Sequence, residues 1–121
     1  MQRFTDLKVW QRSHALVLKI YAITASKFPS DERFGLTAQL RRAAVSVPCN
    51  IAEGSKRRTS KDYAHFLNMA EASLTELECI ILIARDLNYL NSTNAEPLLL
   101  ETDGIARMLH ALRIKVDPPK K

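Results

Sequence analysis

The side chains best suited to chemistry in this 121-residue chain are basic, and their surplus over acidic side chains lies in one quarter of it. Residues 33–61 hold seven basic residues and one acid, Glu53, whereas the remainder holds eleven basic and twelve acidic residues. The segment therefore has a net charge of +6 and the remainder has a net charge of −1, which together give the net charge of +5. Guanidinium and ammonium groups bind phosphates and release counterions, so such a cluster indicates a polyanion. We predict RNA or DNA binding by Arg41, Arg42, Lys56, Arg57, Arg58 and Lys61, with Lys8 and Arg12 as secondary candidates.

Two alternatives remain open for these cations. They could form a solvated face with a basic loop between helices, since no aromatic residue interrupts residues 56–58 to stack on bases. Arg41 and Arg42 could instead pair with acids of another subunit, which would make the chain a protein–protein scaffold or assembly module with no nucleic-acid role. The candidate acids for such pairs are Glu71, Glu76 and Glu78.

Asn50 and Glu53 lie one helical turn apart and so share a face. We predict a structural polar network in which they hydrogen-bond to Arg41, Arg42, Ser46 or a neighbouring helix. A solvated helix end and a ligand site are the alternatives.

Residues for enzymatic chemistry are not clustered. A di-metal bundle needs inward carboxylates and paired Glu-x-x-His motifs, but His14, His65 and His110 provide one carboxylate–histidine pair, in which Asp62 is better explained as a helix cap. Cys49 and Cys79 form no CxxC pair, and there is no phosphate-binding glycine loop or nucleophile elbow. We expect no enzymatic activity, no cofactor and no metal.

The elements that must position these residues are helical. With 3 glycines and 5 prolines, the chain has too few turn residues for a β-sandwich or barrel. Apolar residues recur at i, i+3, i+4 and i+7, which predicts helices over about 6–27, 36–54, 60–88 and 94–115. Short connections between them favour an all-α, antiparallel, up-down-up-down four-helix bundle over residues 1–115, followed by a flexible tail at 116–121.

Local signals set the helix ends. Phe28-Pro29 ends the first helix, because the residue before proline is pushed out of helical geometry. Pro48 predicts a bend in the second helix or, alternatively, two shorter helices. Gly104 weakens the fourth helix or allows a close helix crossing. The other predicted signals are N-caps at Thr5 or Asp6, Thr37, Thr59 and Thr93, and a left-handed C-terminal glycine at Gly54.

We expect a cytoplasmic protein with reduced thiols. The longest apolar runs fall well short of the roughly 20 residues that span a bilayer, so no membrane partner is expected. The first residues do not have the pattern of a signal peptide.

Two sequence blocks resemble the four-helix bundle protein family, also called the 23S rRNA intervening-sequence protein family. One runs from Phe4 to Gln11, and the other runs from Phe34 to Gly54 and contains Arg-Arg-Ala-Ala-Val-Ser followed by Asn-Ile-Ala-Glu-Gly. Further matches end near Leu90, so the resemblance covers about three quarters of the chain. Cys49 departs from the small residue usual at its position.

The resemblance implies a bacterial cytosolic protein, often encoded within a segment inserted in ribosomal RNA genes. It also implies a bundle assembled into a ring, with a homopentamer expected, and no enzymatic activity. The family is similar in fold to accessory proteins of diversity-generating retroelements, which implies nucleic acid and a reverse transcriptase-like protein as partners. Its motif maps onto Arg41, Arg42, Asn50, Glu53 and Gly54, without an established role for each.

Overall fold

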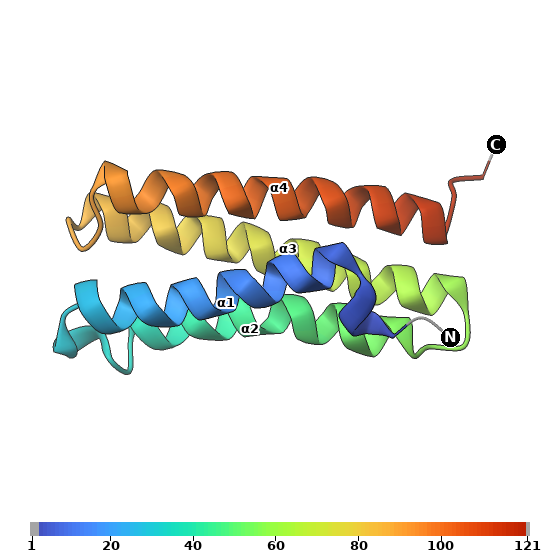
Figure 1. Cartoon of the computed structure of the whole chain (residues 1–121), viewed down its shortest axis with the longest axis horizontal. Helices are drawn as coiled ribbons and strands as arrows, with labels where there is room; N and C mark the ends of the chain where they lie inside the picture. The colour runs from blue at the N-terminus through green and yellow to red at the C-terminus, as the bar shows by residue number, and fades with distance from the viewer. Residues whose placement is uncertain (1–2, 121) are drawn as a thin grey trace.

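Four long α-helices make up the computed structural model, which describes residues 3–120. They are α1 (Lys8–Lys27), α2 (Leu36–Ser55), α3 (Ser60–Asp86) and α4 (Ser92–Val116), with short 3-10 turns η1 (Phe4–Asp6) and η2 (Ser30–Glu32). No strand occurs within residues 3–120. Figure 1 shows consecutive helices running in opposite directions along the long axis of the molecule. The predicted all-α four-helix bundle is confirmed.

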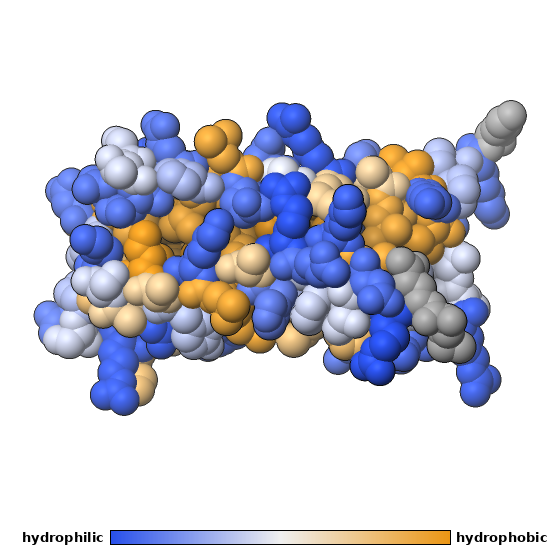
Figure 2. Space-filling model, viewed as in Figure 1, coloured by the Kyte–Doolittle hydropathy of each residue, from blue (hydrophilic) through white to orange (hydrophobic). Residues whose placement is uncertain are grey.

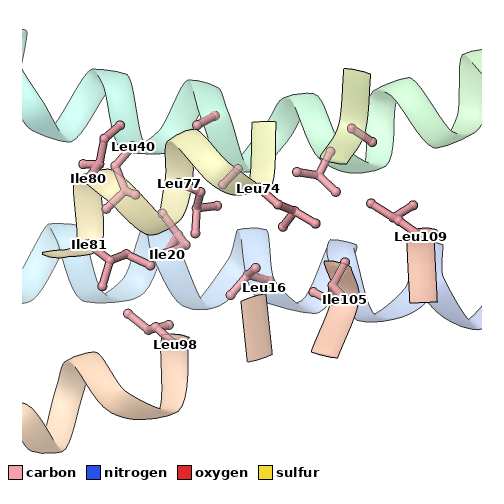
Figure 3. Close-up of a cluster of buried hydrophobic side chains, with 14 of the residues drawn as sticks. Leu16, Ile20, Leu40, Leu74, Leu77, Ile80, Ile81, Leu98, Ile105 and Leu109 are labelled. Carbon is pink, nitrogen blue, oxygen red and sulfur yellow. The ribbon is translucent and has the colours of Figure 1, made fainter. Parts of the chain in front are cut away.

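The core lies along the axis between the helices. Each helix packs against its neighbours in the chain, and α4 also packs against α1, which closes the bundle. Figure 3 shows side chains from all four helices meeting in this core, among them Ile20 of α1, Leu40 of α2, Leu77 of α3 and Ile105 of α4. These four side chains are fully buried, and burial of such apolar area is the main stabilising contribution to the fold.

The second helix runs unbroken through Pro48, so the alternative of two shorter helices is wrong. A proline lacks a backbone N–H and leaves the carbonyl of Ala44 without its helical donor. Pro48 is buried, and the helix continues beyond it to Ser55. As a result, the residues before and after the proline lie on one continuous helical surface.

Three of the predicted N-caps are wrong, and one is confirmed. The N-cap of α1 is Leu7, not Thr5 or Asp6. Thr37 is buried inside α2, and the backbone N–H of Leu36 donates instead to Glu32 Oε1 at 2.9 Å. Asn91, not Thr93, caps α4, because its Oδ1 accepts from the N–H of Asn94 at 2.9 Å. Thr59 caps α3 as predicted, with its hydroxyl accepting from the N–H of Asp62 at 3.1 Å.

Gly54 does not adopt the predicted left-handed conformation, since no glycine within residues 3–120 has a positive φ. It lies within α2, where its missing side chain lets α3 approach closely. A Cβ at Gly54 would lie 2.8 Å from Cβ of Phe66. Close packing of α2 on α3 therefore explains this glycine.

The two connections at the other end of the bundle are joined by Glu32 and Tyr89. The Tyr89 hydroxyl donates to Glu32 Oε2 at 2.9 Å, while Oε1 of the same carboxylate caps α2. The bonds from Leu36 and Tyr89 lower the pKa of Glu32, and the bond to Glu32 raises the pKa of Tyr89. At the opposite end, burial raises the pKa of Tyr63.

No helix within residues 3–120 is long and apolar enough to cross a membrane. The fourth helix reaches Val116, one residue into the predicted tail. That tail ends at Lys121, which lies outside the described residues.

Candidate nucleic-acid interface

The fold divides the basic segment into two groups. We call Arg41 and Arg42 of α2, together with Arg33 just before this helix, the α2 arginines. We call Lys56, Arg57, Arg58 and Lys61 the loop cations, which surround the connection between α2 and α3. Arg42 and Lys56 are 14 residues apart, which corresponds to about 21 Å along the helix. The cations are thus not one compact patch, although they are one segment in the sequence.

Arg41 is held against α1 by neutral groups. Its Nε donates to Thr24 Oγ1 at 2.8 Å, and its Nη2 donates to the carbonyl oxygen of Tyr21 at 3.3 Å. The guanidinium carbon also lies 4.4 Å from the centroid of the Tyr21 ring, within the range of a cation–π interaction. These contacts orient Arg41 without neutralising its charge. Arg42, its neighbour in the chain, is exposed.

Arg57, which is exposed at the loop, also lies over an aromatic ring. Its guanidinium carbon lies 4.6 Å from the centroid of the Phe66 ring on α3. The position of this ring follows from the close approach of α2 and α3 at Gly54. Lys56, Arg58 and Lys61 are exposed around it.

The ion pairs formed within residues 3–120 involve other cations. The ion pairs are Arg12–Glu101, Arg85–Asp86, Arg107–Asp103 and the pairing of Glu71 with both Arg113 and His110. None of the seven cations in the two groups has a carboxylate partner in this part of the chain. Their positive charge is therefore not compensated within the folded chain.

Arg12, a secondary candidate, bridges α1 and α4 instead. Its Nε donates to Glu101 Oε1 at 2.8 Å, and a Cβ at Gly104 would lie 2.7 Å from its Nη2. The glycine therefore makes room for this arginine. Figure 2 shows apolar surface in the seam between α1 and α4, crossed by hydrophilic side chains.

Within residues 3–120, Asn50 and Glu53 make no hydrogen bond or ion pair with Arg41 or Arg42, although Asn50 and Arg42 line one hollow. Asn50 Nδ2 donates to the carbonyl oxygen of Ser46 at 2.8 Å, one turn earlier in α2. Glu53 is exposed, and within residues 3–120 its side chain has neither a hydrogen bond nor an ion pair. Among the other acids, Glu71 pairs with Arg113 of α4 at 2.6 Å, whereas Glu76 and Glu78 are exposed.

Potential metal ligands are dispersed. Within the described part of the chain, no three His, Cys, Asp or Glu side chains are grouped so that they could hold a metal ion. Cys49 and Cys79 are both exposed thiols on different helices.

Sequence reasoning missed the residues that orient the cations. Tyr21 and Thr24 come from α1, and Phe66 comes from α3, so they meet their arginines only in the folded chain. Tyr21 and Thr24 are three residues apart on α1, about one helical turn, and this spacing is the only local signal that the two side chains share a face.

These features define a small four-helix bundle protein with an uncompensated basic surface. The model of the 23S rRNA-intervening sequence protein family matches residues 5–111, and the chain belongs to this family. Among solved structures, the chain is similar to a protein of unknown function from the S23 ribosomal protein family of Bacteroides thetaiotaomicron. That likeness has a TM-score of 0.81 at 19% identity, covers 87% of this chain and 97% of the other, and shows the shared fold. No curated protein matches the chain.

Proposed function

We propose that this protein is a non-enzymatic, oligomeric bundle that binds RNA or DNA through phosphate contacts. The observation that carries the proposal is that none of the seven cations in residues 33–61 has a carboxylate partner within residues 3–120. A surface that keeps its positive charge attracts a polyanion and gains free energy when condensed counterions are released. Membership of the 23S rRNA-intervening sequence protein family is consistent with an RNA ligand.

Two of the arginines are oriented in advance. Arg41 is held over Tyr21 and Arg57 over Phe66, so each loses less side-chain freedom when it binds a phosphate. The planar guanidinium can stack on a ring and still present N–H donors to phosphate oxygens at its edge. The exposed lysines supply charge without this orientation.

Self-association is supported by an exposed stripe on α3. Met69, Ile83 and Leu87 are 41%, 43% and 51% exposed, and Ala72 and Cys79 continue the stripe at helical spacing. Apolar side chains that share one face of a helix are typical of contact surfaces. We propose that another copy covers the stripe, in the homopentamer that the family resemblance implies, inside the bacterial cytoplasm. A reverse transcriptase-like protein is the competing occupant.

Repeated basic groups in such an assembly would act together. When one copy has bound, the next basic group meets the same nucleic acid at a high effective concentration. Modest affinity per chain then gives tight binding for the assembly.

A salt titration tests the proposal. Labelled structured RNA and duplex DNA are titrated with the protein at about 50 mM and about 200 mM salt. One phosphate contact from each of the four loop cations predicts that duplex affinity falls about 100-fold over this range. Affinity that does not change with salt, or no binding to either probe, contradicts the proposal. If the protein assembles but binds neither nucleic acid, the result favours the alternative function of a protein–protein scaffold.

A further inference from the structure

The surface between α1 and α2 carries a groove to which the proposed function assigns no role. Two adjoining hollows, of about 600 Å³ and about 300 Å³, share Val45 and Cys49 in their walls. Together they extend along α2 from Thr37 to Ala52, which corresponds to about 22 Å. No acidic side chain lines either hollow.

Aromatic rings are gathered in the smaller hollow. The rings of Trp10 and His14 are stacked, with centroids 4.9 Å apart and planes 17° apart, and Phe4 meets Trp10 edge-on at 5.4 Å. His14 is exposed, so this stack opens to solvent. It forms an aromatic surface of the kind on which a nucleobase can stack.

The larger hollow adds two further rings. Phe34 is 87% exposed, so its ring is open to solvent. Tyr21 lies across the hollow on α1. Arg41 stacks over Tyr21, and the guanidinium carbon of Arg33 lies 5.2 Å from the centroid of the Phe34 ring. Both rings therefore stand beside a cation.

Cations also stand at both ends of the groove. The α2 arginines line the larger hollow at one end. Beyond the other end, Arg3 lines a neighbouring hollow with Phe4, and Lys56 follows Ala52 by four residues, about one turn, although neither lines the smaller hollow. Rings between two basic ends match a strand whose bases face the rings and whose phosphates face the cations.

We infer that the groove between α1 and α2 binds single-stranded RNA or DNA, with bases stacked against His14 and Phe34 and phosphates at its basic ends. This rests on the proposed function and narrows its ligand class. Protein rings can meet base faces only where the bases are unstacked, as they are in single strands.

A helix from a second copy of the chain is the competing occupant of an apolar groove. Charge favours the nucleic acid, because three arginines and no carboxylate line the groove. The exposed stripe on α3, by contrast, is flanked by charges of both signs, because Met69 and Ala72 line a hollow together with Glu76 and with Arg42 of α2. That stripe remains the surface assigned to self-association.

Trp10 is the only tryptophan in the chain, so its fluorescence reports on the groove directly. A 12-nucleotide RNA, single-stranded or as a duplex of the same sequence, is titrated into the protein while label anisotropy and Trp10 emission are recorded. The single strand is expected to quench Trp10 and to bind about tenfold more tightly than the duplex. His14→Ala, at an exposed position that does not threaten folding, should weaken single-strand binding at least fivefold and leave duplex binding unchanged. His110→Ala, at an exposed position on α4, is the matched control and should change neither affinity by more than about twofold.

The possible failures are distinguishable. Equal binding of both RNAs without a change in Trp10 emission overturns the inference and leaves the proposed function standing. A second copy occupies the groove if Trp10 emission changes with protein concentration alone and RNA binds without affecting that emission. This result also overturns the inference. No binding of either RNA overturns the proposed function as well.

Discussion

Arg41 lies with its guanidinium over the ring of Tyr21, its Cζ atom 4.4 Å from the ring centroid. This contact joins α2 to α1 and leaves the cationic charge intact, because the ring carries no formal charge. Arg113 is different, since its Nε lies 2.6 Å from Glu71 Oε2 and its charge is compensated. Arg41 and Arg57 thus lie over aromatic rings, whereas Arg12 and Arg113 are paired with carboxylates.

Replacing Arg41 with lysine tests the ring contact separately from the charge. Arg41→Lys keeps the positive charge but loses the planar group and the bond from Nε to Thr24. We expect a loss of about 1 kcal/mol in the free energy of unfolding, measured by urea denaturation. The salt dependence of RNA affinity should not change. Unaltered stability would show that the stacking contributes nothing.

Two helical glycines form a matched pair. In Gly54→Ala, the new Cβ would lie 2.8 Å from Cβ of Phe66, which packed helices cannot easily relieve. We expect destabilisation by about 1 to 3 kcal/mol. In Gly104→Ala, the obstacle is the mobile end of Arg12, and the gain in helix propensity offsets its displacement. Similar unfolding free energies for both variants would contradict the close approach at Gly54.

The link between Glu32 and Tyr89 predicts a pH dependence at both extremes. The folded pKa of Glu32 lies below its ordinary value of 4.5, so the stability it contributes is present above that pH and is lost as pH falls through the lowered pKa. The folded pKa of Tyr89 lies above its ordinary value of 10.0, so its contribution is present below that pH and is lost as pH rises through the raised pKa.

Single variants check each side of this link. The difference in urea midpoint between wild type and Glu32→Gln should narrow in acid, and the difference between wild type and Tyr89→Phe should narrow in alkali. Differences that stay constant with pH would mean that neither group's ionisation is linked to folding.

The exposed stripe on α3 predicts where assembly fails. Ile83→Glu places a charge in the middle of the proposed contact, so we expect a lower mass by light scattering at the same protein concentration. Leu100→Glu is the matched control, because Leu100 is 73% exposed on α4, outside the stripe. Loss of assembly in the control alone would place the contact on α4.

The helices themselves were predictable because their signal is local. Apolar residues at helical spacing gave all four elements to within a few residues. The error at Gly54 has a non-local origin, since Phe66 of α3 explains the glycine. The error at Thr37 is local, because the group that caps α2 is Glu32, four residues before Leu36. A residue's own type does not show which distant partner will satisfy it.

The cations were predictable from composition, but their arrangement was not. Arg42 and Lys56 lie in one charged segment of the sequence, yet a continuous helix holds them about 21 Å apart. Trp10 and His14 lie far from that segment in the chain and reach its neighbourhood only because α1 packs against α2. For this reason, the absence of aromatic residues from residues 56–58 gave no indication of the aromatic groove.

The most direct measurement compares two double charge reversals. Arg57→Glu/Arg58→Glu and Arg85→Glu/Arg107→Glu change the net charge equally, but only the first pair lies in the loop cations, and circular dichroism confirms that each variant is folded. Affinity for labelled structured RNA is measured over a range of salt concentrations. We predict that the loop variant binds at least tenfold more weakly and that its log–log salt slope is shallower by about 2, whereas the control stays near wild type. Equal losses in both variants, or none in the loop variant, would contradict phosphate binding by these cations.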